Sequence, residues 1–302
     1  MLRRIPDVNY QRERIDTPDG DFLDLDWLKH PPALEASFGG RARKLVIISH
    51  GLEGNTFRPY MRGMAKACFD ARFDVLAWNF RGCAQEMNRL PRFYHGGATD
   101  DLGTVVNHAL SLGTYDDLYL VGFSMGGNIT LKYLGEQPRP AAIRKAVALS
   151  VPLDLHSTVM KISLPENRIY ARRFLKSLKL KITTKAAFIP GFDTAGLDTI
   201  KTLQAFDDHY TAPLHGFADA IDYYTNSSSL YYLDGIDRPA LIVNAQNDPF
   251  LSPASYPAAR LKGHAHIHFE DPLRGGHVGF AQFHKNGLYW SESRTLDFLK
   301  HD

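Results

Sequence analysis

The chain has 302 residues, of which 44% are hydrophobic, 23% charged and 12% aromatic, and this ordinary globular composition excludes a disordered chain, a collagen-like repeat and a bundle of membrane-spanning helices. The 35 Lys and Arg residues against 33 Asp and Glu leave a formal net charge of +2, so no positive excess indicates a nucleic-acid partner. The two cysteines, Cys68 and Cys83, are too few for a disulfide framework or a tetrahedral metal site, and they favour a reducing compartment.

The N-terminal residues carry early positive charge but lack the apolar stretch of about 7–15 residues that a secretion signal requires. No apolar run in the chain reaches the length of about 20 residues that a membrane-spanning helix needs. We therefore expect a soluble, cytoplasmic protein without a transmembrane segment.

Short apolar runs rich in β-branched residues alternate along the chain with longer stretches of helical periodicity. This alternation is typical of a mostly parallel sheet whose strands are joined by crossover helices. In chain order, strands are predicted at 21–27, 44–49, 73–78, 117–123, 145–149, 240–244 and 266–269. Helices are predicted at 58–71, 99–112, 125–135 and 289–299.

Residues 152–234 interrupt this alternation, because they contain several helical patterns and no convincing strand. An insertion between two strands lies most simply over the C-terminal edge of the sheet, where α/β sheets bind their ligands. We therefore predict a helical cap at 152–234, inserted into a core formed by residues 1–151 and 235–302.

The segment Gly122–Gly126 reads Gly-Phe-Ser-Met-Gly and matches the pattern Gly-x-Ser-x-Gly between a predicted strand and a predicted helix. A sharp strand-to-helix turn forces the serine backbone into a strained conformation, and only small residues fit two positions before and after it. This context predicts that Ser124 is a nucleophile rather than a structural turn residue.

A serine hydroxyl needs a base that takes its proton, and the base needs a carboxylate that orients it. In this architecture the three residues follow one another in the order Ser, Asp or Glu, His. Asp248 comes just after the predicted strand 240–244, and His277 lies in a glycine-rich loop after the last predicted strand. We predict the triad Ser124, Asp248 and His277, with Asp154 as the competing acid.

The loop 49–54, after the predicted strand 44–49, contains Gly51 and Gly54, which permit a tight return of the chain. Acyl transfer requires backbone N–H donors aimed at the oxyanion that develops. We expect one donor at Met125 and the other at Leu52, with Gly51 less favoured. His50, directly before a glycine turn, is expected to brace this loop rather than to act as the base.

Several longer motifs resemble those of an α/β-hydrolase of the YheT-like branch, the AB hydrolase 4 family. The similarity extends over residues 15–300 and is carried by the segments HGLEG at 50–54, NFRGC at 79–83, YHGGATDDL at 94–102, GFSMGGN at 122–128 and FDDHYTAPLHGF at 206–217. It implies an α/β-hydrolase fold, a mostly parallel twisted sheet flanked by helices with a helical cap insertion.

The same resemblance implies a serine hydrolase that cleaves carboxylic esters, short- to medium-chain acyl esters or lipids, without a metal or cofactor. Because the branch also includes acyltransferases, the alternative reaction is ester formation from an acyl thioester and an alcohol. A non-catalytic ligand-binding protein of the same fold is a third interpretation, which the intact triad disfavours.

Residues 161–185 contain eight Lys and Arg residues against the single acidic residue Glu166, interleaved with apolar residues. This pattern permits peripheral contact with an anionic membrane surface. The favoured interpretation is a cap helix whose apolar side faces the protein and whose charges face water. The expected partner is a small-molecule ester or lipid substrate, and the sequence does not indicate an oligomeric state.

Overall fold

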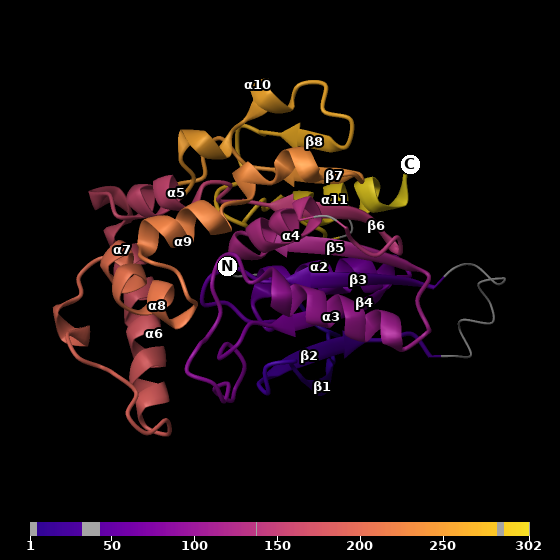
Figure 1. Ribbon diagram of the computed structural model, residues 1–302. Helices are drawn as coiled ribbons and strands as arrows, with labels where there is room; N and C mark the ends of the chain where they lie inside the picture. The colour runs from indigo at the N-terminus through magenta and orange to yellow at the C-terminus, as the bar shows by residue number, and fades with distance from the viewer. Residues whose placement is uncertain (1–4, 32–42, 137, 283–286, 302) are drawn as a thin grey trace.

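The computed structural model describes residues 5–31, 43–136, 138–282 and 287–301 (Figure 1). Within these residues, eight strands form one sheet in the order β1-β2-β4-β3-β5-β6-β7-β8. The strands are β1 (Gln11–Asp16), β2 (Phe22–Leu28), β3 (Lys44–Ser49), β4 (Asp74–Asn79), β5 (Asp117–Phe123), β6 (Ile143–Leu149), β7 (Ala240–Val243) and β8 (Ile267–Glu270). The pairs β1–β2 and β2–β4 are antiparallel. The remaining pairs, β4–β3, β3–β5, β5–β6, β6–β7 and β7–β8, are parallel.

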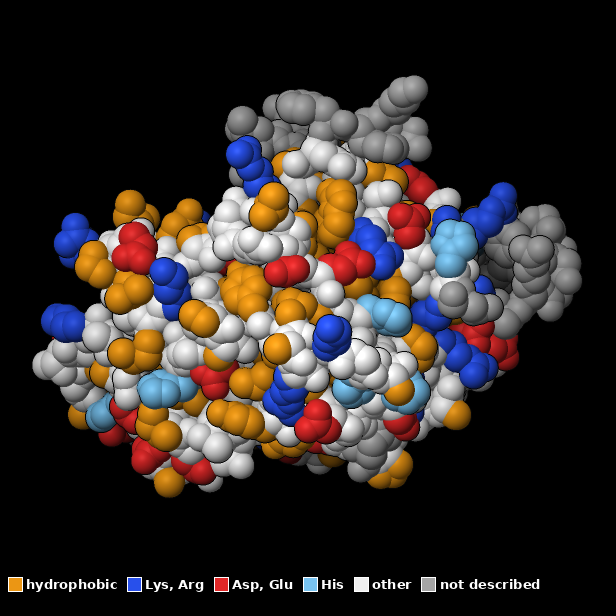
Figure 2. All heavy atoms as spheres, turned by 90° about the horizontal axis from the view of Figure 1, so that it is seen from above, with side chains coloured by type: hydrophobic (Ala, Val, Ile, Leu, Met, Phe, Trp, Pro, Cys, Tyr) orange, Lys and Arg blue, Asp and Glu red, His pale blue; other side chains and the backbone are white. Residues whose placement is uncertain are grey.

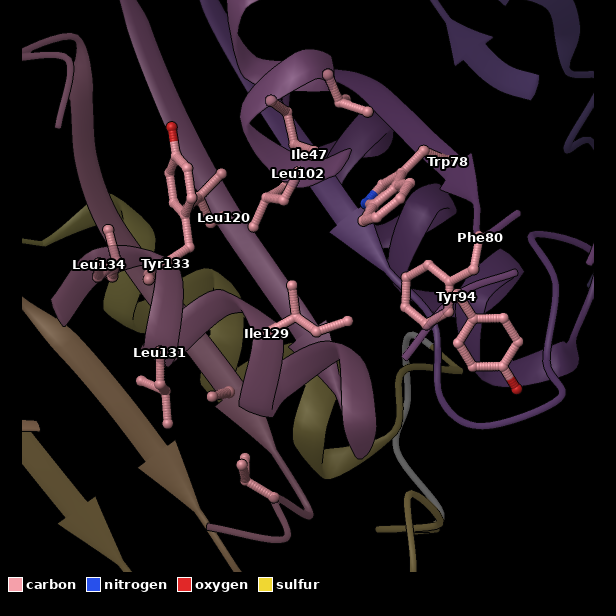
Figure 3. Packing of buried hydrophobic residues seen from close by; sticks show 14 of the residues in the cluster. Ile47, Trp78, Phe80, Tyr94, Leu102, Leu120, Ile129, Leu131, Tyr133 and Leu134 are labelled. Atoms are coloured by element: carbon pink, nitrogen blue, oxygen red, sulfur yellow. The ribbon is translucent and has the colours of Figure 1, made fainter. Parts of the chain in front are cut away.

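Helices cover both faces of the sheet and create two hydrophobic cores. On one face, α3 (Thr99–Ser111) and α4 (Met125–Gly135) pack on a cluster that includes Leu45 and Ile47 of β3. On the other face, α2 (Pro59–Asp70) and α11 (Trp290–Lys300) pack on Val46 and Ile48. Figure 3 shows Ile47 in the first cluster, beside side chains of neighbouring strands and α4. Because β3 is buried on both faces, its sequence is a continuous apolar run rather than an alternating one.

This architecture confirms the predicted fold class. Each strand and helix that the sequence predicted is present, with bounds that differ by at most two residues from the expected ones. The edge strand β1 was not predicted, because its sequence QRERID is polar and four of its six residues are exposed. It is held by cross-strand ion pairs, in which Arg12 contacts Asp26 at 2.7 Å and Arg14 contacts Asp24 at 2.7 Å.

Between β6 and β7 the described chain contains helices and no strand, and these helices gather at one side of the sheet (Figure 1). They are α5 (Leu155–Ile162), α6 (Arg168–Ala186), α7 (Leu203–Phe206), the π-helix η4 (Asp207–Thr211), α8 (Ala212–Leu214) and α9 (Ala220–Ser227). Short 3₁₀ segments are η2 (Pro165–Asn167), η3 (Leu197–Thr199), η5 (Ser229–Tyr231), η6 (Leu233–Gly235) and η7 (Pro253–Ser255), and α10 (Ala258–Leu261) precedes β8. The division of the chain at residues 152 and 235 stays a prediction.

The parallel strands end together at one edge of the sheet. Ser49 at the end of β3 pairs with Gly122 near the end of β5, and Leu149 at the end of β6 pairs with Val243 at the end of β7. Val243 in turn pairs with Glu270, the last residue of β8. The loops that follow β3, β5, β7 and β8 therefore start from the same edge, which is where α/β sheets bind ligands.

The expectation that the charges of the basic segment 161–185 face water is wrong for two of its eight basic side chains. Lys181 and Lys185 on α6 are buried, and both donate hydrogen bonds to the loop 82–90, with Lys185 Nζ 2.9 Å from Asn88 Oδ1. They point inward because they share the buried face of α6 with Leu178 and Ile182. On the face shown in Figure 2, positive and negative side chains are interspersed with apolar ones. None of the described helices is long and apolar enough to span a membrane.

Candidate active site

Ser124 lies in the turn between β5 and α4, with backbone angles φ 53° and ψ −121°. Positive φ is unfavourable for a residue with a side chain and costs about 1–3 kcal/mol, so the surrounding structure must impose it. A Cβ atom added to Gly122 would lie 2.4 Å from the carbonyl oxygen of Gly126, and one added to Gly126 would lie 2.4 Å from that of His50. The two glycines are therefore a steric requirement of this turn.

Of the three residues predicted as a triad, His277 lies within hydrogen-bonding distance of both Ser124 and Asp248. His277 Nε2 is 3.0 Å from Ser124 Oγ, and His277 Nδ1 is 2.8 Å from Asp248 Oδ2. Asp248 is buried, and its other oxygen accepts a hydrogen bond from the Phe250 amide at 3.0 Å. The carboxylate can thus hold the imidazole with its Nδ1 protonated and its Nε2 facing the serine.

The loop that carries His277 is fixed by a residue that the sequence did not single out. Asn247 Oδ1 accepts hydrogen bonds at 2.9 Å from the backbone amides of both Gly275 and Gly276. The amide of Val278 donates to the hydroxyl of Ser150 at 2.9 Å. The position of Asn247 directly before Asp248 was the only signal available in the sequence.

Asp154, the competing acid, makes other contacts. Its Oδ1 accepts a hydrogen bond from the Ser157 amide at 2.7 Å, which makes Asp154 the N-cap of α5. Its Oδ2 accepts a hydrogen bond from the Tyr231 hydroxyl at 3.3 Å. A helix cap was the alternative role for an acidic residue at the start of a helix.

Two backbone amides beside Ser124 can donate hydrogen bonds to a negatively charged oxygen. Met125 is the first residue of α4, so its N–H has no acceptor within the helix and lies at the positive end of the helix dipole. Among the described residues the Leu52 amide has no acceptor, whereas the Gly51 amide is 3.1 Å from the hydroxyl oxygen of Tyr60. Leu52 and Met125 line the same cavity as Ser124 and His277.

His50 braces the loop 49–54 and is not placed to act as a base. Its Nδ1 lies 2.7 Å from the carbonyl oxygen of Gly51, and its Nε2 accepts a hydrogen bond from the Phe80 amide at 3.1 Å. Burial lowers the pKa of His50 to about 3, so the ring is neutral with its proton on Nδ1. The ring therefore connects the loop after β3 to the loop after β4.

A second connection reaches this loop from α6. Glu53, which has a φ of 51°, accepts a hydrogen bond from the Tyr94 hydroxyl at 2.7 Å, and its own amide donates to the Tyr94 oxygen at 2.9 Å. Lys181 Nζ lies 3.5 Å from Glu53 Oε1 and also donates to the carbonyl oxygen of Gly82. In the sequence, the burial of Lys181 is indicated only by its helical spacing of three residues from Leu178, an apolar residue on the same face of α6.

Ser124 and His277 open onto a cavity of about 800 Å³, including its open mouth. Its walls are mainly apolar, and helices between β6 and β7 supply many of them: Leu155, Val159, Ile162, Phe174, Leu178 and Leu203. Such a cavity can hold an apolar chain next to the nucleophile. Among the described residues no cluster of three or more His, Cys, Asp or Glu side chains is arranged to hold a metal ion.

Known proteins share this sequence pattern and fold. Residues 44–281 match the family model of the alpha/beta hydrolase fold. The chain is 32% identical over 299 residues to the putative esterase YheT of Escherichia coli, a match that covers 95% of this chain and 84% of that protein. It is 30% identical to a monoacylglycerol lipase of Saccharomyces cerevisiae over 86% of this chain and 59% of that protein. It is 27% identical to the phospholipase ABHD3 of Homo sapiens over 97% of this chain and 71% of that protein.

Among solved structures, an esterase of Pyrococcus furiosus, Pf2001, superposes with a TM-score of 0.63. The two chains are 18% identical, and the match covers 97% of this chain and 90% of the esterase, which supports the fold alone. The family model and the relative from Escherichia coli show the family to which the chain belongs. The chain belongs to the α/β-hydrolase family and, within it, to the YheT-like branch.

Proposed function

We propose that this protein is a serine hydrolase that cleaves carboxylic esters through a covalent acyl-enzyme. The observation that carries the proposal is the position of His277, with one ring nitrogen 3.0 Å from Ser124 Oγ and the other 2.8 Å from Asp248. The names of the relatives, which include an esterase, a lipase and a phospholipase, support ester cleavage as the reaction. We assign Ser124, His277 and Asp248 as the catalytic triad, on a nucleophile elbow formed by residues 122–126.

In the proposed reaction, Ser124 Oγ attacks the ester carbonyl carbon while His277 Nε2 takes the hydroxyl proton. The carbonyl oxygen becomes an oxyanion and accepts hydrogen bonds from the amides of Leu52 and Met125. His277 then gives its proton to the departing alcohol. Water, deprotonated by the same nitrogen, attacks the acyl-enzyme and releases the acid. Asp248 stabilises the imidazolium in both steps.

We also propose that residues 152–234 act as a cap that shapes the acyl site. The support is that α5, α6 and α7 line the apolar cavity beside Ser124. A cytoplasmic location is proposed from Cys68 and Cys83, which are buried free thiols that require no oxidising compartment.

Acyl transfer to an alcohol is the second candidate, because the same acyl-enzyme can react with either water or an alcohol. One relative, 25% identical over 84% of this chain and 61% of its own length, is named a medium-chain fatty acid ethyl ester synthase/esterase. Adding ethanol to a preformed acyl-enzyme distinguishes the reactions, since a transferase yields mainly the ethyl ester and a hydrolase mainly the free acid.

Labelling with a fluorophosphonate tests the proposed nucleophile. Wild type is expected to gain one adduct by intact-mass spectrometry, because Ser124 Oγ, losing its proton to His277, attacks phosphorus and displaces fluoride. Ser124→Ala is expected to gain none. Ser163→Ala, which removes an exposed hydroxyl bonded to the Val159 carbonyl oxygen, serves as the matched control and should label like wild type. A folded wild type that stays unlabelled would favour a non-catalytic binding protein.

Lys181 is proposed as a positioning residue for the oxyanion loop. Lys181→Met removes the contact with Glu53 and should lower kcat for a simple ester by about tenfold, because complete loss of one oxyanion donor costs about 10²–10³. The KM should change less than kcat, since the bound ester is still held by the apolar cavity.

The matched control for this test is Lys179→Met on the same helix, whose Nζ reaches only the carbonyl oxygen of Asp198 at 3.5 Å. Thermal unfolding of both variants shows whether a lower kcat results from loss of stability instead. Equal kcat in the two variants would show that Lys181 has a structural role alone.

Contact with anionic lipid is a further hypothesis for α6. Its exposed face carries Arg168, Arg172 and Arg173 beside Ile169, which is 80% exposed. If this face binds a membrane, wild type should co-sediment with anionic but not with neutral vesicles. An Arg172→Gln and Arg173→Gln double variant should then bind the anionic vesicles more than about tenfold more weakly, since each basic residue near such a surface contributes about 1 kcal/mol. Equal recovery with both vesicle types would mean that these charges simply face water.

A further inference from the structure

The cavity beside Ser124 contains two further side chains that can carry charge, His95 and Asp207, which the proposed reaction does not use. Both remain partly accessible. Desolvation by the surrounding protein is nevertheless the main reason why the pKa of His95 is lowered and that of Asp207 is raised. This combination is the one expected for groups that face an internal cavity rather than the outer surface.

Asp207 is the first residue of the π-helix η4, a helix type that frequently occurs at functional sites. Its Oδ1 accepts a hydrogen bond from Thr211 Oγ1 at 2.6 Å, and its Oδ2 accepts one from the Tyr224 hydroxyl at 2.7 Å. Burial raises the pKa of Asp207 to about 6. An ionised carboxylate can accept about four hydrogen bonds, so two lone-pair positions remain for a ligand.

His95 offers the complementary donor. Its Nδ1 accepts a hydrogen bond from the Gly97 amide at 3.2 Å, so in the neutral ring the proton lies on Nε2. Burial and the nearby His215 hold the pKa of His95 well below its usual range, which keeps the ring neutral. Among the described residues the Nε2–H has no acceptor.

Aromatic contacts place His95 and Asp207 in one part of the cavity wall. The His95 ring lies 5.8 Å from the Tyr223 ring, and the Tyr223 ring lies 5.1 Å from that of Tyr224. Tyr224 donates directly to Asp207. An acceptor and a donor thus occur in the same region of a cavity whose other walls are mainly apolar.

We propose that His95 and Asp207 form a hydroxyl-binding subsite, so the ester that this enzyme hydrolyses carries a free hydroxyl group. A hydroxyl is both a donor and an acceptor, so it matches the Asp207 carboxylate as a donor and the His95 Nε2–H as an acceptor in the same cavity. A plain alkyl chain would desolvate both groups without giving a partner to the His95 Nε2–H or to the remaining lone pairs of Asp207, which is unfavourable. The inference rests on the proposed function and names the substrate class of the same site.

The hydroxyl can belong to the alcohol part or to the acyl part of the ester, and two matched substrate pairs separate these sources. The first pair is a monoacyl glycerol ester and the propyl ester of the same acid. The second is the ethyl ester of a hydroxylated fatty acid and that of the unsubstituted acid. Wild type should show a kcat/KM about tenfold higher for the hydroxylated member of one pair, since a site built to bind a hydroxyl discriminates against its absence.

The variants are Asp207→Asn, which removes the charge and one acceptor oxygen, and His95→Phe, which keeps a ring and removes the donor. Each should reduce the preference to about twofold or less while plain esters are still hydrolysed. Asp208→Asn is the matched control on the adjacent residue, whose exposed carboxylate accepts from the Ala220 amide at 2.8 Å, and its preference should equal that of wild type.

An enzyme that labels at Ser124 and hydrolyses plain esters without preference in either pair would overturn the subsite and leave the proposed function intact. Equal losses on both members of a pair would assign His95 and Asp207 a structural role. A stronger preference for an ester that bears a quaternary ammonium group would also contradict the proposal, because that group cannot accept from His95. Absence of hydrolysis with every ester would contradict the proposed function itself. Circular dichroism checks that each variant is folded.

Discussion

The site depends on one backbone turn, in which Ser124 has a positive φ between a strand and a helix. Such a conformation persists only when its surroundings leave no alternative. Here the chain passes so close to itself that neither Gly122 nor Gly126 could carry a side chain. The turn also leaves the Met125 amide, at the start of α4, without an acceptor inside the helix. One local constraint therefore exposes the hydroxyl and supplies a donor for negative charge next to it.

The rest of the site consists of loops that the parallel sheet brings to this turn and that buried polar contacts then fix. Asn247 holds the loop of His277 through two backbone amides, and His50 connects the loops after β3 and β4. Glu53 and Lys181 tie the loop 49–54 to helix α6. A helix that lines the substrate cavity thus also touches the loop proposed to hold the oxyanion. This arrangement can couple the seating of a substrate to the alignment of Leu52.

The sequence predicted the parts of the molecule that local rules determine. The turn at Ser124 follows from glycine spacing, and strands β2 to β8 follow from their apolar residues, so these were identified correctly, whereas the polar edge strand β1 was missed. Long-range contacts were missed, because Lys181 meets the loop at Gly82 nearly one hundred positions away in the chain, and its charge suggested a surface residue. His95 and Asp207 lie in two separate family motifs, and the sequence alone does not reveal that they line one cavity.

The assignment of Ser124 as the nucleophile, with the amides of Leu52 and Met125 as oxyanion donors, can be tested by a structure of the enzyme after reaction with a fluorophosphonate. We expect a phosphorus atom bonded to Ser124 Oγ, with the phosphonyl oxygen within hydrogen-bonding distance of the backbone amides of Leu52 and Met125. His277 should remain between the adduct and Asp248. An adduct on another residue, or a phosphonyl oxygen that contacts neither amide, would contradict the assignment of both the nucleophile and the oxyanion site.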